Sequence, residues 1–263
     1  MSRSILTVPV RKIEGEASTP LQDFLAVEEP LEIHLGEKAI SLTMRTPGHD
    51  PELACGFLFT EGIVQDFGQI RDIHSAKNSI TIGLKPDVEV DFDRLERHFY
   101  TTSSCGVCGK ASIEALRMIG CPQLPRDSPR LSAAVIHSLP HSLRSAQAVF
   151  ERTGALHAAA LFDSQGQLQM LREDVGRHNA VDKLVGAQMM AGRTPLGANL
   201  LLVSGRTSFE LTQKALMAGI PILAAVGAPS SLAVETAQRF NMTLLGFVRD
   251  GRFNIYSGAQ RIQ

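Results

Sequence analysis

The chain has 263 residues, of which 44% are hydrophobic and 20% charged, and its 26 basic and 27 acidic side chains leave a formal charge of -1. This length allows one large or two smaller domains with a buried core, and the composition is that of a soluble globular protein. The balanced charge predicts no nucleic-acid or membrane partner. The N-terminus holds too short an apolar run for a signal peptide, so we expect a cytoplasmic protein.

The first part of the chain is expected to be rich in strands. Residues 1–30 show no firm periodicity and are expected to form an irregular arm. Residues 31–35 and 39–44 alternate apolar and polar side chains on either side of a short turn, which predicts a β-hairpin. Further strands are predicted at residues 79–84 and 88–92.

One helix is predicted between these strands. Asp50 is suited to be its N-cap and Pro51 its first residue, and the apolar pattern stops near Gly62. Cys55 falls within this pattern, which favours a small core residue over a metal ligand.

Two thiols, Cys105 and Cys108, stand three residues apart in a loop of small residues, residues 101–110. A helical pattern follows at residues 111–119, and its N-terminus together with Lys110 favours thiolate over thiol. The spacing alone leaves three interpretations open: half of a metal site, a redox couple, or a carrier that holds a persulfide. All four cysteines are expected to be reduced, because a chain of this length does not look like a disulfide framework.

A proline-rich linker follows Cys121, and we place a domain boundary near residues 120–130. The prediction is a strand-rich region over residues 1–125 and an α/β domain over residues 126–263. Two helices around Pro140 are expected to end at Gly154.

Alternating strands and helices are expected after Gly154. A hairpin is predicted from residues 156–162 and 167–171, followed by helices at residues 180–190, 208–217 and 229–240 and strands at residues 199–203, 222–226 and 242–248. The succession strand-helix-strand-helix-strand implies a parallel sheet covered by helices. The uncharged run at residues 215–234 matches a membrane span in length, but glycines and prolines interrupt it, which favours a buried strand between two helices.

Ligands of parallel sheets bind beyond the carboxyl ends of the strands. Small residues, hydroxyls and arginines follow three predicted strands at residues 204–208, 227–231 and 249–252. The first of these segments is Ser204, Gly205, Arg206, Thr207 and Ser208. Each segment alone is more often a plain connection, but three at one edge favour a site for a phosphorylated ligand. No Walker loop or dinucleotide fingerprint is present.

A second polar group lies at residues 172–179, where Arg177 and His178 are candidates for phosphate contact or proton transfer. A solvated connection with its own ion pairs is an equally good interpretation. His157 begins an otherwise apolar strand, and a lone histidine there is more often a core residue than a catalyst.

Four segments together resemble the FdhD family of formate dehydrogenase accessory proteins: residues 102–109 (TSSCGVCG), 173–183 (EDVGRHNAVDK), 204–210 (SGRTSFE) and 44–48 (MRTPG). The resemblance implies a sulfurtransferase, in which a cysteine desulfurase passes sulfur to Cys105 as a persulfide and Cys108 assists. The sulfur would go to the molybdenum cofactor, a bis-molybdopterin guanine dinucleotide, before its insertion into formate dehydrogenase.

The resemblance further implies a homodimer and a cytidine-deaminase-like α/β core with a mixed sheet. It implies a cofactor-holding segment at Phe247, Val248, Arg249, Asp250, Gly251 and Arg252. Sulfur transfer suits an exposed thiolate of low pKa, since it must attack an incoming persulfide and then release the outer sulfur.

Several rival functions remain open. A zinc deaminase needs H-x-E and a later P-C-x-x-C, whereas Ala159 stands where the glutamate would be and Ser104 precedes Cys105. A structural zinc site needs four ligands, of which only two are well spaced, so we expect no metal. A disulfide reductase lacks the thioredoxin-like context. A cofactor-binding chaperone without sulfur transfer is the non-enzymatic alternative.

Overall fold

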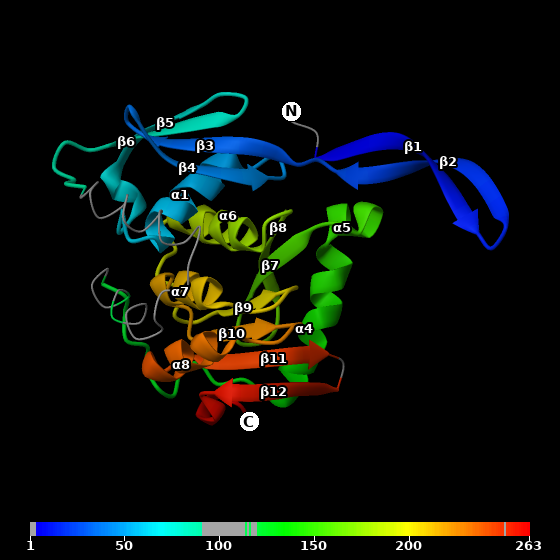
Figure 1. The fold of residues 1–263 in the computed structure, drawn as a ribbon. Coiled ribbons are helices and arrows are strands. Elements are labelled where there is room, and N and C mark those ends of the chain that lie inside the picture. Colours follow the sequence, from blue (N-terminus) through cyan, green and yellow to red (C-terminus); the bar gives the residue numbers. More distant parts are fainter. Residues whose placement is uncertain (1–3, 91–113, 115, 117–119, 250) are drawn as a thin grey trace.

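The computed structural model describes residues 4–90, 114, 116, 120–249 and 251–263. The described residues form two larger β-sheets with helices between and beside them, and a separate two-stranded ribbon (Figure 1). Cys105, Cys108 and Asp250 lie outside the described residues, as does most of the helix predicted at residues 111–119.

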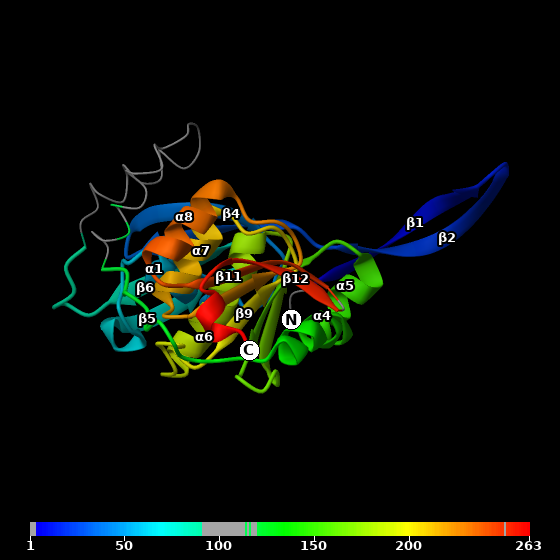
Figure 2. The ribbon, with the colours of Figure 1, turned by 90° about the horizontal axis from the view of Figure 1, so that it is seen from below.

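The N-terminal residues form a long ribbon. β1 (Ile5–Glu14) and β2 (Ala17–Ala26) pair antiparallel along their whole length, with Gly15 at φ 61° in the turn. The expectation of an irregular arm was wrong. Most of these side chains are exposed, so no core imposes the strict alternation of apolar and polar residues by which strands are recognised. Figures 1 and 2 show the ribbon projecting away from the remainder of the described chain.

The smaller sheet has the strand order β4-β3-β6-β5. The predicted hairpin is confirmed as β3 (Glu29–Leu35) and β4 (Lys38–Arg45), and the strand at residues 79–84 as β6 (Ser79–Leu84). β5 (Ile70–Ser75), which follows the 3-10 turn η1 (Phe67–Gln69), was not predicted. The strand predicted at residues 88–92 does not form over residues 88–90, because the chain turns at Pro86 and the Val88 amide donates to Lys85 O.

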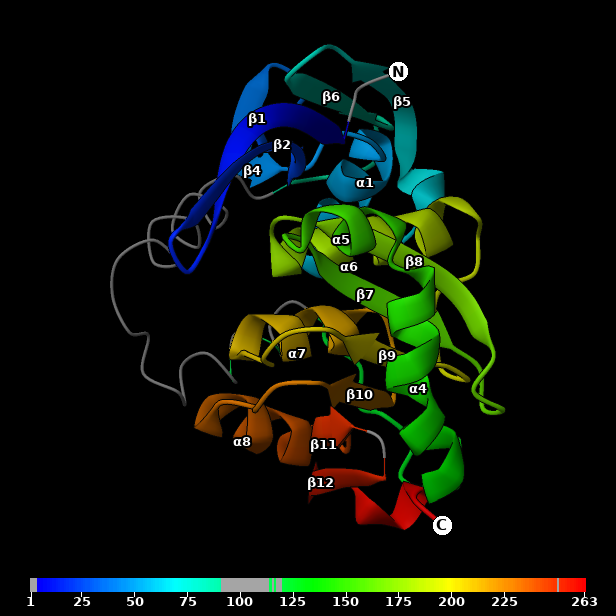
Figure 3. The ribbon, with the colours of Figure 1, turned by 90° about the vertical axis from the view of Figure 1, so that its right-hand side faces the viewer.

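α1 (Asp50–Thr60) packs against α6 (Arg177–Met190), between the two sheets (Figure 3). A Cβ on Gly56 would lie 1.9 Å from the carbonyl oxygen of Asp182, and one on Gly186 would lie 1.8 Å from that of Glu52. The two helix backbones are therefore in direct contact. The predicted helix is confirmed, but its N-cap is His49, and Asp50 is its first residue.

The larger sheet has the strand order β12-β11-β10-β9-β7-β8. Its strands are β7 (His157–Phe162), β8 (Leu168–Asp174), β9 (Leu200–Val203), β10 (Ile222–Ala225), β11 (Thr243–Arg249) and β12 (Arg252–Ser257). β9, β10 and β11 are parallel, as predicted, while β7, β8 and β12 pair antiparallel. The sheet is therefore mixed, and its last strand, β12, was not predicted.

Helices cover both faces of this sheet. Figure 3 shows α7 (Phe209–Met217) and α8 (Ser231–Arg239) on one face and α4 (Ala133–Ala146) on the other. Alternate residues of the central strands enter separate apolar clusters on these faces, for example Leu201 with α7 and Leu202 with α4. α5 (Ala148–Thr153) ends at Gly154, and the short turn η2 (Ala259–Arg261) lies near the C-terminus.

The uncharged run at residues 215–234 is confirmed as the end of α7, the buried strand β10 and the start of α8. Within the ranges that the structure describes, no helix has the length and apolar character needed to cross a membrane. The division at residues 125 and 126 stays a prediction.

Candidate functional site

The ends of the three parallel strands come together as predicted. The Gly227 amide after β10 donates to Gly205 O at 2.9 Å, and the Phe247 amide in β11 donates to Gly227 O at 3.0 Å. The Thr207 amide donates to Ala228 O at 3.1 Å. The loops that follow β9 and β10 and the end of β11 therefore form one continuous edge, beside which α7 and α8 begin.

Glycine at two of these positions is required by packing. A Cβ on Gly227 would lie 2.9 Å from Gly205 O, and one on Gly246 would lie 2.9 Å from the Pro229 ring. Arg206 is exposed at this edge, Ser204 and Ser208 are half-buried, and Thr207 is buried. Among the predicted residues of this segment, Arg206 and the two serines are thus available to a ligand.

His178 and Arg177 lie at the start of α6, next to the same edge. His178 Nε2 is 3.5 Å from Ser208 Oγ. Burial, with the positive charges of Arg177 and Lys214, lowers the pKa of His178 to about 4. The imidazole is therefore neutral at neutral pH and offers one N–H donor and one acceptor, while Arg177 supplies the charge.

His157 also belongs to this edge and is not the core residue that the sequence favoured. It is half-buried at the start of β7, and a Cβ on Gly205 would lie 3.3 Å from its Nδ1. Burial and the charge of Arg177 lower the pKa of His157. The sequence does not show that His157 lies at this edge, because its position there depends on the antiparallel pairing of β7 with β9.

The turn between β11 and β12 carries the segment at residues 247–252. Phe247 has φ 53°, a left-handed backbone that is unusual for an aromatic residue, and the pairing of the two strands shifts register here. Phe247, Arg249 and Arg252 are exposed, whereas Val248 is buried in the apolar cluster on the α4 face. Gly251 has φ 78°, as a tight turn requires.

The structure thus places Arg177, His178, Ser208 and His157 in one neighbourhood. The β11–β12 turn meets the same edge through the Phe247 amide.

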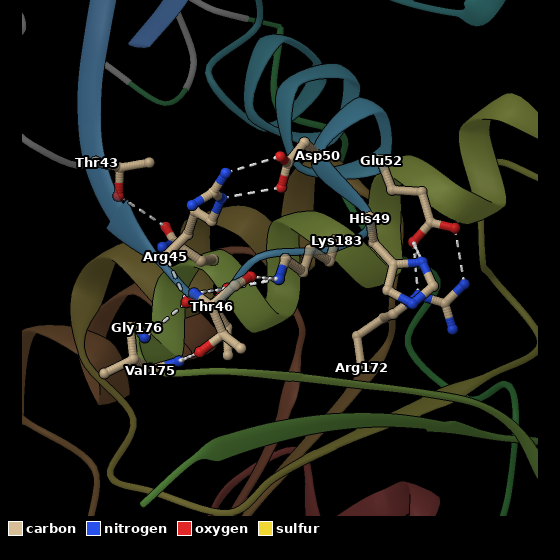
Figure 4. A network of polar contacts seen from close by, with 12 residues as sticks. Thr43, Arg45, Thr46, His49, Asp50, Glu52, Arg172, Val175, Gly176 and Lys183 are labelled. Atoms are coloured by element: carbon tan, nitrogen blue, oxygen red, sulfur yellow. Dashed lines mark hydrogen bonds and ion pairs between the residues drawn. The ribbon is translucent and has the colours of Figure 1, made fainter. Parts of the chain in front are cut away.

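A buried polar network connects two of the recognised segments, residues 44–48 and 173–183 (Figure 4). Asp174 is fully buried and lies 2.6 Å from Lys183 Nζ. It also accepts hydrogen bonds from the amides of Thr46 at 3.2 Å and Gly176 at 2.8 Å, and from Asn179 Nδ2 at 3.1 Å. Asp174, Asn179 and Lys183 are therefore scaffold residues that fix the start of α6.

The segment at residues 44–48 completes this scaffold. Lys183 Nζ donates to Thr46 O at 2.8 Å, and Asn179 Nδ2 donates to Met44 O at 2.8 Å. Arg45 is buried and donates to both oxygens of Asp50 at 3.0 Å. The segment consequently binds the end of β4 to the loop that carries Arg177 and His178.

A second buried network supports α6 and α7. Lys214 Nζ is 3.0 Å from both Asp182 and Glu61 carboxylates, and Thr60 Oγ1 donates to Asp182 at 2.8 Å. Burial alone would lower the pKa of Lys214, but the two carboxylates outweigh it and raise that pKa. Lys214 is therefore charged and contributes to the low pKa of His178.

The two described cysteines are poor nucleophiles. Cys55 is buried in the core, as predicted, and Cys121 is half-buried. Burial raises the pKa of each thiol to about 12, so neither is a thiolate at neutral pH. Across the described ranges, no group of three or more histidine, cysteine or acidic side chains is arranged to hold a metal ion.

Comparison with known proteins covers nearly the whole chain. The model of the FdhD/NarQ family matches residues 26–263. A Streptomyces avermitilis protein named "Sulfur carrier protein FdhD" is 50% identical over 264 residues, which are 96% of this chain and 93% of that protein. A Mycolicibacterium paratuberculosis protein of the same name is 52% identical over 256 residues, covering 90% of this chain and 91% of that protein.

A solved structure shares the fold. The crystal structure of a Desulfotalea psychrophila protein, provisionally assigned as a formate dehydrogenase accessory protein, is 26% identical with a TM-score of 0.79 and covers 99% of this chain and 100% of that chain. The resemblance found in four separate segments thus extends along the whole sequence and the whole fold, and the chain belongs to the FdhD/NarQ family.

Proposed function

We propose that the protein is a sulfur carrier that takes persulfide sulfur from a cysteine desulfurase and delivers it to the molybdenum cofactor of formate dehydrogenase. The observation that carries this proposal is the name "Sulfur carrier protein FdhD" of relatives about half identical to the chain over at least 90% of its length. The pair Cys105 and Cys108 supplies the thiols that such a role needs.

The loading step is a thiol exchange. The Cys105 thiolate attacks the outer sulfur of the desulfurase persulfide, a new S–S bond forms on Cys105, and the desulfurase cysteine leaves as a thiolate. The high pKa values of Cys55 and Cys121 support the assignment of this role to the loop cysteines.

The release step requires a second thiolate. Cys108 attacks Cys105 at its inner sulfur, so that a Cys105–Cys108 disulfide forms and the outer sulfur leaves, reduced to sulfide, for the metal. The two cysteines are oxidised in this step, and a cellular thiol must reduce them before the next cycle.

The cofactor is cargo and would be held at the strand ends. Bis-molybdopterin guanine dinucleotide carries pyrophosphate groups, which suit arginine donors and the N-termini of helices. Arg177, His178 and Arg206 would bind these groups with the hydroxyls of Ser204 and Ser208, and the exposed ring of Phe247 with Arg249 and Arg252 would hold the guanine end. The convergence of the strand ends supports this part of the proposal.

Formate dehydrogenase would be the acceptor of the loaded cofactor and thus a direct partner.

A cytidine-deaminase-like origin of the larger sheet is compatible with the mixed strand order of that sheet, and we propose it together with the function. The cytoplasmic location stays a prediction.

Intact-mass spectrometry tests the carrier role. The metal-free protein is incubated with a cysteine desulfurase and cysteine, and we expect a cyanide-labile gain of one sulfur, about 32 Da. The gain should disappear in Cys105→Ala and persist in Cys55→Ala, the control for a buried thiol. A wild-type protein that gains no sulfur contradicts the proposal.

The same variants test the chaperone alternative. Cys105→Ala should abolish the activation of formate dehydrogenase while cofactor binding remains. Full activation by Cys105→Ala would instead establish a cofactor-binding chaperone without sulfur transfer.

A further inference from the structure

Glu210 ends the recognised segment at residues 204–210 and has no role in the cofactor site proposed above. It is exposed in the first turn of α7, directly after the N-cap residue Ser208 and Phe209. Its carboxylate accepts hydrogen bonds from the Ser208 hydroxyl and from its own amide. Ser208 Oγ is in turn 3.5 Å from His178 Nε2. Glu210 therefore belongs to the same neighbourhood of the strand edge as Ser208 and His178.

This carboxylate is a fixed negative charge beside groups that would hold phosphates. Burial would raise the pKa of Glu210, but the hydrogen bonds from Ser208 and from its own amide, with the nearby His178 and Arg177, outweigh burial and lower that pKa. Glu210 is therefore ionised at neutral pH. Since Arg177 and His178 are the side chains assigned to the pyrophosphate, the charge of Glu210 also acts on the phosphates that they bind.

Lys214, one turn further along α7, does not offset this negative charge. Its ammonium lies 3.0 Å from the carboxylates of both Asp182 and Glu61, so it is already matched by two negative charges. The positive charge offered to a ligand comes from the two arginines assigned to the pyrophosphate, of which Arg206 is exposed. Glu210 opposes part of their attraction, so the edge favours phosphates of low charge.

The charge of a pyrophosphate depends on how it is esterified. In a dinucleotide both phosphates are esterified, and each carries one negative charge at neutral pH. A free nucleoside diphosphate ends in a phosphate that loses a second proton with a pKa of about 6, so it carries nearly one further charge. Guanine contacts cannot separate these two ligands, because both contain the same base. Repulsion of the additional charge can separate them.

We propose that Glu210 is a specificity-determining residue that favours a doubly esterified pyrophosphate over a terminal phosphate, and thereby the dinucleotide cofactor over free guanine nucleotides. The carboxylate stands beside Ser208 and His178, where the additional charge of a terminal phosphate meets it directly. The inference rests on the proposed function for the class of ligand. It is independent of the thiol chemistry.

Isothermal titration calorimetry of the full chain with two matched ligands tests this inference. The ligands are GDP and GDP methylated at its β-phosphate, which differ by one methyl group and nearly one charge. The wild type should bind the methyl ester about five- to tenfold more tightly than GDP, the effect of one further charge near a carboxylate in a partly exposed site. Glu210→Gln keeps an oxygen that can accept from Ser208, and it should abolish the preference by tightening the binding of GDP.

Two further variants are the controls. Glu210→Asp keeps the charge and should keep the preference. Glu235→Gln removes an exposed carboxylate from the neighbouring helix α8 and should change the ratio of the two affinities less than about twofold, because its charge is screened by solvent.

The remaining outcomes overturn the inference in distinguishable ways. Equal affinities in the wild type, or a preference that survives Glu210→Gln, would show that this carboxylate does not select the ligand. Weaker binding of both ligands by Glu210→Gln would make Glu210 a positioning residue instead. A folded wild type that binds neither ligand would refute the guanine-nucleotide site of the proposed function, and this inference with it, whereas the gain of sulfur at Cys105 would still be tested separately.

Discussion

The carboxylate of Asp174 shows how one recognised segment combines scaffold and site. It is fully buried and is satisfied by Lys183 and by three N–H donors. Arg177 and His178, only a few residues away, are half-buried and face the strand ends. The sequence presents all of them as one polar run, and only their burial separates the residues that hold α6 from those that are accessible at the strand edge.

Loss of the Lys183 charge tests the scaffold role. Lys183→Met would leave the Asp174 carboxylate buried without its counter-charge, which we expect to lower the free energy of unfolding by about 3 to 5 kcal/mol. Urea denaturation measures this. Lys85→Met, at an exposed position, should change stability by less than about 0.5 kcal/mol, and an equal effect of the two variants would refute the scaffold role.

The low pKa of His178 gives a prediction for pH. In the unfolded chain the imidazole titrates near about 6.5, whereas in the folded protein burial, Arg177 and Lys214 lower its pKa to about 4. The unfolded state therefore binds more protons between these values, so this group makes stability fall as the pH drops from about 6.5 to 4.

NMR titration of the His178 ring checks the value directly. The chemical shift should have its midpoint near pH 4 in the folded protein and near about 6.5 in urea. In His178→Asn the corresponding loss of stability between these pH values should be absent. A midpoint above 6 in the folded protein would contradict the environment described for this residue.

The contact between α1 and α6 is an interaction between whole elements. Gly56 and Gly186 bring the backbones together, and this contact joins the helix that follows the smaller sheet to the helix that begins at the candidate site. Both glycines lie inside predicted helices, where the sequence gives no reason for them. A glycine required by a neighbouring helix can be recognised only once that neighbour is known.

Gly186→Ala is expected to separate these helices. The new Cβ would overlap the carbonyl oxygen of Glu52, and overpacking of this kind costs about 3 kcal/mol. The higher helix propensity of alanine offsets about 1 kcal/mol of this cost. We therefore expect chemical denaturation to show a free energy of unfolding that is about 2 kcal/mol lower. Gly197→Ala, where nothing lies within 4 Å, is the control, and an unchanged Gly186→Ala protein would show that the helices are not this close.

The pair of Glu52 and Arg172 connects α1 to β8. Arg172 donates to the two carboxylate oxygens at 2.6 and 2.8 Å, and His49 Nδ1 is 3.2 Å from Glu52. Burial would raise the pKa of Glu52, but hydrogen bonds and charges from Arg172 and His49 outweigh it and lower that pKa to about 2. The stabilisation that this ion pair contributes is complete above pH 4.5, the ordinary pKa of a glutamate, and it is lost as the pH falls toward 2.

Glu52→Gln should therefore cost about 1 to 2 kcal/mol at neutral pH, allowing for partial exposure of the pair. The difference from wild type should shrink between pH 4.5 and pH 2 when unfolding is followed by circular dichroism. Glu37→Gln, in the exposed turn between β3 and β4, should show no such dependence. A deficit that persists unchanged to pH 2 would rule out the ionised pair as its cause.

The sequence predicted those elements that bury one face or both. β3, β4 and β6 alternate apolar and polar residues, as strands with one buried face do. β9 and β10 are short apolar runs between helices, as strands buried on both faces are. β1 and β2 escaped prediction because almost none of their side chains enter a core. The place of His157 at the strand edge was not predicted, because its neighbours depend on the order of the strands in the sheet. The sequence of a single strand does not reveal that order.

At the scale of the whole molecule, the proposed function needs two separable parts, a thiol loop that loads sulfur and a strand edge that binds the cofactor. In this proposal, loading would depend on the nucleophilicity of Cys105, whereas binding would depend on Arg177, His178 and the loops after β9 and β10. The described edge reaches its geometry through β7, β9, β10, β11 and α6. Substitutions at one part should therefore leave the other working.

Arg177→Ala should weaken the binding of GDP, a probe for the guanine dinucleotide end, by about 10- to 150-fold, since one charge-assisted contact contributes about 1.5 to 3 kcal/mol. Calorimetry measures this, and the same variant should still gain one cyanide-labile sulfur. Cys105→Ala should show the reverse, with wild-type GDP affinity and no sulfur gain. Arg193→Ala, at an exposed position, is the control and should resemble wild type in both measurements. Loss of sulfur loading by Arg177→Ala in a folded protein would refute the separation, because it would make the strand edge part of the thiol chemistry itself.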